Sequence, residues 1–454
     1  MNICEIPRSG THRIKAKNDC KVNTQQILKE MNTILKCSLT AFIALILIAM
    51  PVQAQNWPNW RGPGSDGIAG KGNYPVRFSA TDDLLWKSEL PGKGGSTPIV
   101  WKDRIILTSG VGEGTEGEDG VLCYDWTGKL QWQVKLGRQI PGRNARGSGS
   151  CPSAVTDGER LFVFFKSSTV AALNLNGKVL WKTNLQENYG AITYFWDLGS
   201  SPILVGDNVV ITVMHEGSSY LLALDQVSGK VAWKYDRNYS CGRESAQSYT
   251  TPLVIREGNR ANIVVWGADH LTGHDAATGE LIWSYSGFNP EKRPAWRTIA
   301  SPVISRGVVM VPYGRGQYIA GMKAGGSGEF TQKDFLWQKN GIGTDVATPV
   351  VSDGKVYILG FNGSIWCLDL LTGEELWKTT LPGGNGVYYS SPTLAGDKLY
   401  ICSDEGAFYV CQISPTGIQI LNQTKFEDYV VATPVLVRDR ILLRGTKNLY
   451  CIGK

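Results

Sequence analysis

Residues 222–233 read Leu-Ala-Leu-Asp-Gln-Val-Ser-Gly-Lys-Val-Ala-Trp, and this pattern returns several times along the chain. Asp275 and Asp369 begin the same pattern, with Thr-Gly following and a Trp eight residues later, at Trp283 and Trp377. Asp before Ser/Thr-Gly is turn chemistry, because the carboxylate binds nearby backbone N–H groups and Gly accepts a positive φ. Alternating residues on either side predict that the stretch is a β-hairpin.

A second repeated feature is a proline that follows Ser, Thr or Cys and precedes a short apolar run. The eight examples are Thr97-Pro98, Cys151-Pro152, Ser201-Pro202, Thr251-Pro252, Ser301-Pro302, Thr348-Pro349, Ser391-Pro392 and Thr433-Pro434. Successive prolines are 42 to 54 residues apart, and a near-constant period in this range is typical of repeat architectures. Because proline is tolerated at the first residue of a strand, each repeat is expected to begin with a strand.

Each repeat also has room for two further strands between the proline and the Asp. In the sixth repeat these lie at 355–359 and 364–368, on either side of Phe361-Asn362-Gly363. Four strands per repeat, repeated eight times, predict an all-β chain folded as a single eight-bladed β-propeller.

The two ends of the chain are expected to share the last blade. After Pro434 only three strands are evident, near 435–438, 440–444 and 448–452. The missing fourth strand is expected at residues 84–90, which closely match the Trp-containing stretch at 179–185. The N-terminal strand would complete the last blade and close the ring, which leaves no long sheet edge exposed.

The repeat resembles the pyrroloquinoline-quinone (PQQ)-like propeller repeat, with a Pro-started strand, an Ala-Leu-Asp stretch, Thr-Gly-Lys and a docking Trp. The resemblance covers residues 84–454, and residues 222–233 fit it best. This family contains quinoprotein dehydrogenases, the BamB-type assembly lipoprotein of the outer membrane, and many secreted proteins of unknown role. The segment Trp57-Pro-Asn-Trp-Arg-Gly-Pro63 resembles the leader of that last, secreted group.

For a dehydrogenase, the resemblance implies a quinone on a Trp floor beneath a disulfide of adjacent cysteines. It also implies Ca²⁺ held by Glu, Asn and Asp, with an Asp as base. Calcium needs several oxygen ligands in one shell. This chain has no adjacent cysteine pair, and no Glu/Asn/Asp set aligns with that pattern. No cofactor, metal site or catalytic residue is therefore expected, and PQQ with calcium is kept as the alternative.

The N-terminal region has the features of an export signal. Residues 39–50 are apolar but too few to span a bilayer, which needs about 20 such residues. Val52-Gln53-Ala54 is a small-residue cleavage site. We therefore predict a signal peptide at 1–54, with Met31 as an alternative start, a Trp-rich leader at 55–80 and the propeller at 81–454. The mature protein is expected to be periplasmic or extracellular, with no transmembrane segment.

Charge and cysteine usage exclude several function classes. The formal net charge is +6, and residues 1–54 carry most of it, so the mature chain has no electrostatic footprint for nucleic acid. Seven cysteines remain after cleavage, and no Cys-x-x-Cys pattern exists. Cys123, Cys367 and Cys451 occupy a position where other repeats carry Ala or Gly, so they are expected to be small core residues. Cys402 and Cys411 flank a turn, which leaves a cross-strand disulfide as an alternative.

One tryptophan recurs in almost every repeat, and we expect these residues to dock neighbouring blades against each other. They are Trp86, Trp132, Trp181, Trp233, Trp283, Trp337 and Trp377. The seventh repeat departs from the pattern, with Ile420-Leu421-Asn422 where the Trp is expected.

Ligand contacts are expected in the connections between each Trp strand and the next Pro strand, at the mouth of the central channel. The candidate ligand-binding residues are Arg143, Arg146, Trp196, Asp197, Arg243, Tyr249, Trp296 and Arg297. Arginine and aromatic side chains around a concavity suit an anionic, planar or sugar-like ligand. The alternative is that these side chains plug the channel.

Three classes of function follow from the sequence. The first is a non-catalytic binding or assembly scaffold in the cell envelope, which binds its ligand or partner at the channel mouth. The others are an extracellular glycan- or small-molecule-binding protein and a PQQ/calcium-dependent dehydrogenase of alcohols or sugars. The expected partner is an envelope protein or a small polar or glycan ligand, and the chain is expected to be a monomer.

Overall fold

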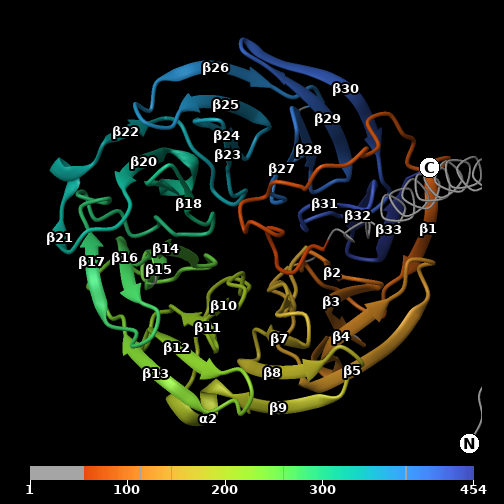
Figure 1. The fold of residues 1–454 in the computed structure, drawn as a ribbon, viewed down its shortest axis with the longest axis horizontal. Coiled ribbons are helices and arrows are strands. Elements are labelled where there is room, and N and C mark those ends of the chain that lie inside the picture. The colour runs from red at the N-terminus through yellow and green to blue at the C-terminus, as the bar shows by residue number, and fades with distance from the viewer. Residues whose placement is uncertain (1–55, 113, 145, 259, 384–385, 454) are drawn as a thin grey trace, which may run out of the picture. The chain divides into compact units, whose positions relative to one another are not determined.

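The computed structural model describes residues 56–453, apart from 113, 145, 259 and 384–385. The described residues belong to one compact unit. The predicted signal peptide lies outside the described residues. The compact unit is a ring of eight β-sheets, viewed along its axis in Figure 1. The predicted all-β, eight-bladed β-propeller is therefore confirmed.

In blades 1 to 4, each strand pairs antiparallel with the next one along the chain. Blade 1 contains β2 (Ile99–Trp101), β3 (Arg104–Val111), β4 (Glu118–Tyr124) and β5 (Leu130–Arg138). Blade 2 contains β6 (Val155–Thr156), β7 (Arg160–Phe164), β8 (Thr169–Asn174) and β9 (Val179–Asn184). Blade 3 contains β10 (Ile203–Val205), β11 (Asn208–Val213), β12 (Tyr220–Asp225) and β13 (Val231–Asp236). Blade 4 contains β14 (Leu253–Glu257), β15 (Arg260–Gly267), β16 (His270–Asp275) and β17 (Leu281–Tyr285).

Blades 5 to 8 follow the same plan with two departures. Blade 5 contains β18 (Val303–Ser305), β19 (Val308–Tyr313), β20 (Tyr318–Lys323) and β22 (Trp337–Asn340). Blade 6 contains β23 (Val350–Ser352), β24 (Lys355–Leu359), β25 (Ser364–Asp369) and β26 (Glu375–Thr380). Blade 7 contains β27 (Thr393–Ala395), β28 (Lys398–Cys402), β29 (Ala407–Ser414) and β30 (Gly417–Lys425). Blade 8 contains β31 (Val435–Val437), β32 (Arg440–Arg444), β33 (Asn448–Ile452) and β1 (Leu84–Glu89).

The first departure is β21 (Gly328–Phe330), a fifth strand that the sequence did not indicate. It comes from the hairpin between β20 and β22 and pairs parallel with β17 of blade 4. The helical elements of the described chain are short: η1 (Gly114–Glu116), α2 (Leu185–Tyr189), η2 (Gly314–Gly316) and η3 (Gln332–Asp334). Among the described residues, no helix combines the length and apolar character needed to cross a bilayer.

The second departure from the plan of blades 1 to 4 is in blade 8, whose outer strand is the N-terminal strand β1. This closure of the ring was predicted. β1 pairs antiparallel with β33 from Leu84↔Ile452 to Glu89↔Asn448. In Figure 1 the orange N-terminal strand lies against the blue C-terminal blade. Arg444 of β32 adds a buried tie to blade 1, because its guanidinium donates to the backbone oxygen of Thr108 at 2.6 Å. Blade 8 is thus assembled from both ends of the propeller.

A ring of hydrogen bonds joins the starts of the inner strands. In seven links, a Ser or Thr that precedes an inner strand donates its backbone N–H to the corresponding Ser or Thr hydroxyl of the next blade. The links run Thr97→Ser153→Ser201→Thr251→Ser301→Thr348→Ser391 and Thr433→Thr97, at 2.9 to 3.1 Å. The last link closes across the two ends of the chain.

This ring corrects the predicted register of the second repeat. Cys151-Pro152 does not take the place of the other Ser/Thr-Pro pairs, because Ser153 receives the bond from Thr97 and Ala154 precedes β6. The Cys151 thiol instead donates to the backbone oxygen of Ser148 at 3.3 Å. The position is defined by a hydroxyl that accepts an N–H, and the proline is optional.

The recurring tryptophans lie at the junctions between blades. Trp86 of blade 8 packs against Gly128 in the turn of blade 1, where an added Cβ would lie 2.6 Å from the ring. Its Nε1 donates to the backbone oxygen of Trp126 at 2.9 Å. The same contact joins Trp132 to Gly177, Trp181 to Gly229, Trp233 to Gly279 and Trp337 to Gly373. Each of these turn glycines has a φ between +68° and +85°, which fits only glycine comfortably.

Two of the seven tryptophans differ from this arrangement. Trp283 is 1 % exposed and pairs with Gly328 of the added strand β21. Trp377 is buried in the core shared by blades 6 and 7, where it packs near Tyr357. Neither indole N–H has a hydrogen-bond partner among the described residues.

The leader supplies the aromatic contact that blade 7 lacks. Asn422, at the end of the stretch where a Trp was expected, donates from Nδ2 to the backbone oxygen of Phe78 at 3.0 Å. The Phe78 ring packs edge-on against Phe408, with 5.4 Å between ring centroids. Residues 56–80 therefore belong to the fold, since Trp57 also bridges Val100 of blade 1.

The seven cysteines of the described chain are all free. Cys402 and Cys411 are not bridged, because they lie at different register positions of β28 and β29 and face Phe408 and Leu399. Cys123, Cys367 and Cys451 are fully buried and stand opposite Trp132, Trp377 and Trp86 in the strand register. A small side chain is needed at these positions because the indole of the tryptophan lies over the residue opposite it on the neighbouring strand.

Candidate functional site

The eight connections between an outer strand and the next inner strand surround a cavity of about 290 Å³ at the channel mouth. Every one of these connections contributes to its wall. The lining residues are Trp60, Gly95, Thr97, Asn144, Arg146, Gly147, Cys151, Ser153, Trp196, Asp197, Gly199, Ser201, Tyr249, Arg297, Ile299, Val346, Tyr389, Ser391, Val431 and Thr433. The cavity therefore lies on the axis of the ring, as expected for a mouth shared by all blades.

Five of the eight predicted ligand-binding residues line this cavity: Arg146, Trp196, Asp197, Tyr249 and Arg297. They come from the connections that follow blades 1, 2, 3 and 4. The connections after blades 5, 6 and 7 contribute Val346, Tyr389 and Val431. The charged lining residues thus come from the connections after blades 1, 2 and 4, and the later connections add apolar and aromatic side chains.

Each charged residue that lines the cavity has a partner of opposite sign. Arg146 Nε lies 2.7 Å from Asp404 Oδ2, and this pair links the connection after blade 1 to blade 7. Arg297 Nη2 donates to Asp345 Oδ2 at 2.7 Å. These pairs fix the arginines and leave the mouth with no uncompensated cation.

Asp197 forms the third pair, with Lys166. The distance from Lys166 Nζ to Asp197 Oδ1 is 2.6 Å, and both side chains are little exposed. The backbone N–H of Arg143 also donates to this carboxylate at 3.1 Å. Burial raises the pKa of Asp404, although the N–H of Val387 and the nearby Arg146 act against it. The carboxylates around the cavity are therefore held as structural acceptors.

A hydrogen-bond chain holds the backbone of Trp196. Tyr249 is 4 % exposed and donates from its hydroxyl to Gln247 Oε1 at 2.5 Å. The backbone N–H of Trp196 donates to the same Tyr249 hydroxyl at 3.2 Å. Burial raises the pKa of Tyr249, so it stays protonated and can serve as this donor. The Arg297 guanidinium lies 5.1 Å from the Trp196 ring centroid.

Three predicted residues do not line the cavity. Arg143 packs on the Phe195 ring at 3.8 Å and donates from Nη1 to the Phe195 backbone oxygen. Arg243 is exposed and pairs with Glu216 at 3.1 Å, over a separate depression. Trp296 packs against Tyr313, with 5.0 Å between ring centroids.

Sequence reasoning missed several residues of the site. Asn144 lines the cavity and its Oδ1 accepts the N–H of Arg146 at 2.9 Å, which shapes the loop. Tyr389 lines the cavity from the connection after blade 6. Trp60 comes from the leader and lines both the mouth cavity and a second cavity. The second cavity lies on the other side of the hydrogen-bonded ring of Ser and Thr hydroxyls. The dense Trp57–Pro63 motif was the available signal for Trp60.

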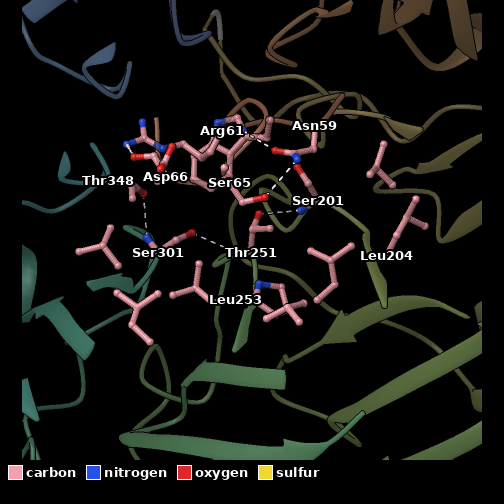
Figure 2. Close-up of a pocket in the computed structure, with 18 of the residues that line it drawn as sticks. Asn59, Arg61, Ser65, Asp66, Ser201, Leu204, Thr251, Leu253, Ser301 and Thr348 are labelled. Atoms are coloured by element: carbon pink, nitrogen blue, oxygen red, sulfur yellow. Dashed lines mark hydrogen bonds between the residues drawn. The ribbon is translucent and has the colours of Figure 1, made fainter. Parts of the chain in front are cut away.

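The second cavity, of about 420 Å³, lies between the leader and the inner strands of blades 2 to 6. Figure 2 shows Arg61 and Asp66 of the leader near the hydroxyls of Ser201, Thr251 and Ser301. The Arg61 guanidinium is buried and donates to the backbone oxygens of Pro349 and Pro392 at 3.0 and 3.1 Å.

Those contacts lock the leader across blades 6 and 7. Burial lowers the pKa of Arg61 to about 10, so it remains charged at neutral pH. Trp60 and Ser201 line both cavities, so the two cavities adjoin at these residues.

The residues at the mouth do not fit a calcium-bound quinone. Within the described part of the chain, no group of three His, Cys, Asp or Glu side chains is placed to hold a metal. Asp197, Asp345 and Asp404 each face a cation instead of one another. A calcium shell needs six to eight oxygen ligands. The expected absence of a cofactor stays a prediction.

Comparison with known proteins gives a consistent relationship. A family model described as outer membrane protein assembly factor BamB matches residues 76–238 and 213–415. The chain is 26 % identical over 380 residues to the outer membrane protein assembly factor BamB of Yersinia pestis, covering 79 % of each chain. It is 22 % identical over 359 residues to that of Moranella endobia, covering 59 % of this chain and 88 % of the relative.

Two solved structures share the fold at low identity. BamB from Moraxella catarrhalis has a TM-score of 0.56 at 15 % identity, covering 82 % of this chain and 97 % of that one. A europium-containing methanol dehydrogenase has a TM-score of 0.62 at 12 % identity, covering 88 % and 92 %. At these identities the likeness extends to the eight-bladed fold alone.

Proposed function

This chain belongs to the family of outer membrane protein assembly factor BamB, and from that premise we propose that it is an exported, non-catalytic binding scaffold of the cell envelope. Its binding site is the mouth cavity, where all eight blade connections meet. The relatives named above are assembly factors, so an envelope protein or another envelope component is the natural partner class.

The observation that carries this proposal is the pairing of every charged side chain in the cavity. A carboxylate beside a cation is a weaker base, because the positive charge favours its ionised form. Asp197 accepts from Lys166 and the Arg143 backbone, and Asp404 accepts from Val387, with Arg146 beside it. These carboxylates hold loops together, so the site is built to present a fixed surface.

The arrangement also favours binding through rigidity. The mouth rests on the hydroxyl ring and on inner strands that are buried between blades, so its loops start from fixed positions. Recognition sites on loops held by a rigid scaffold bind with little loss of conformational entropy. Tyr429 stands at the rim, 43 % exposed and 5.3 Å from the Arg146 guanidinium.

Site-specific photo-cross-linking in the native cell tests the proposal. A benzophenone amino acid at Tyr429 is expected to capture one envelope component, identified by mass spectrometry. The same group at Val227, which is 71 % exposed in the turn between β12 and β13, is the control. That turn lies on the opposite face of the ring, because successive strands alternate in direction.

The expected result is a cross-link at Tyr429 that weakens when Tyr389 is replaced by Ala. An equal pattern of adducts from Tyr429 and Val227 would contradict the mouth as the binding site. Melting curves of each variant keep a folding defect apart from a binding defect.

A further inference from the structure

We propose that the mouth cavity takes one neutral sugar ring of an envelope saccharide. This inference rests on the proposed function, because it names the ligand class of the same cavity. It narrows the sequence-based expectation of an anionic, planar or sugar-like ligand to the last of these three classes.

Charge balance excludes a site built for an anion. Arg146 and Arg297 are the two arginines of the wall, and each has a carboxylate 2.7 Å away. The third charged lining residue is Asp197, which is neutralised by Lys166 at 2.6 Å. An anion would have to break one of these pairs and leave a largely buried carboxylate without its cation, which is strongly unfavourable. A neutral ligand leaves all three pairs intact.

Aromatic faces provide the surface on which a sugar ring packs. Trp60, Trp196 and Tyr389 all line the cavity and are half-buried, so each keeps part of its ring accessible. Ile299, Val346 and Val431 complete the apolar side. A sugar ring has one face of C–H groups, and flat aromatic side chains bury such a face at low entropic cost.

Unpaired donors provide the polar half of the match. The hydroxyls of Ser153, Ser201 and Ser391 line the cavity and each accept a backbone N–H, and none of the described hydrogen bonds uses their own hydrogens. Buried polar groups normally find partners. Hydroxyl and ring oxygens of a sugar are neutral acceptors that could satisfy these donors.

The size of the cavity limits the ligand to a small group. Its volume of about 290 Å³ lies at the lower end of the range for ligand pockets, roughly 300–1,000 Å³. A longer saccharide would therefore enter by one terminal ring and leave the rest at the rim near Tyr429.

Calorimetric titration with three probes tests the proposal: glucose, N-acetylglucosamine and glucuronate. At least one neutral sugar is expected to bind more tightly than glucuronate. Trp196→Ala should weaken that binding about tenfold or more, the loss typical of truncating a central aromatic anchor. Trp296→Ala is the matched control, because this Trp packs against Tyr313 outside the cavity. The affinity of the Trp296→Ala variant for the neutral sugar should stay within about twofold of wild type.

A second readout uses the unmodified protein. Cys151 lines the cavity, whereas Cys241 is half-buried elsewhere. A saturating neutral sugar should slow the modification of Cys151 by methyl methanethiosulfonate and leave Cys241 unchanged, measured by peptide mass spectrometry. This readout decides the question if Trp196→Ala does not fold.

Tighter binding of glucuronate than of both neutral sugars would overturn the proposal. So would the absence of both heat and Cys151 protection with all three probes. In that case a Tyr429-specific cross-link would still support the mouth as a binding site for another ligand class. Failure of the cross-linking experiment as well would remove the proposed function itself.

Discussion

Closure of the ring predicts a specific energetic coupling between Trp86 and Gly128, which lie in blades 8 and 1. Replacing Trp86 by Ala removes a half-buried indole and its 2.9 Å bond to the Trp126 backbone oxygen, at a cost of about 3 kcal/mol. Gly128→Ala places a methyl group 2.6 Å from the ring at a φ of +81°. The positive φ costs about 1 kcal/mol and the overlap about 2 more.

In the double variant the overlap disappears, so Gly128→Ala adds only the cost of the positive φ to the cost of losing Trp86. The two single effects should therefore be non-additive by about 2 kcal/mol. Urea unfolding followed by circular dichroism measures the four free energies. Trp181 and Gly229 are the matched interior control, with the same 2.6 Å contact and a 3.0 Å indole bond. Additive effects at Trp86 and Gly128, with coupling at the control pair, would refute closure by β1.

Three further predictions follow from buried groups. Burial raises the pKa of Asp119 to about 7, so the native state retains a proton that the unfolded chain releases near pH 4. The free energy of unfolding should therefore fall as the pH rises from about 4 to 7. Urea unfolding at a series of pH values measures this fall, and Asp119→Asn should abolish the contribution of Asp119 to it. Arg444→Met should destabilise the protein by about 3 kcal/mol, because buried acceptors of blade 1 lose their donor, as denaturant midpoints would show. Ellman's reagent should titrate at most Cys151 and Cys241 in the native protein and all seven thiols of the mature chain after unfolding.

The architecture could be predicted because its signals are local and repeated. The turn that begins at Asp225 needs only its own carboxylate and Gly229, and the carboxylate accepts the Ser228 N–H at 2.7 Å in the structure. Trp233 follows at a fixed distance because the hairpin is short. Repetition of such a unit fixes the strand order, and the incomplete last repeat identifies strand β1 as its complement.

The register of blade 2 could not be read from the prolines. Pro152 marks the start of a strand in the sequence pattern, but the hydrogen-bonded ring selects the Ser153 hydroxyl. That choice depends on the N–H of Thr97 in the preceding blade, a contact between residues 56 apart. Likewise, the role of Phe78 depends on blade 7, more than 300 residues away.

The orientation of the loop side chains was the least predictable part of the site. Arg146 and Arg297 face the cavity because Asp404 and Asp345 hold them there. Arg243 also lies in a loop rich in charged and aromatic residues, but it pairs with Glu216 beside a different depression. Composition identified the correct loops, whereas the choice between these arginines required the positions of acids on other blades.

The most direct test of a non-catalytic site is the content of the protein purified from the periplasm of its own organism. Absorbance spectroscopy and elemental analysis would measure quinone and calcium per chain. The paired charges at the mouth predict no quinone absorbance and less than one calcium per chain after dialysis against metal-free buffer. One quinone and one calcium per chain, retained through purification, would contradict the account and place the protein with the quinone-dependent oxidoreductases.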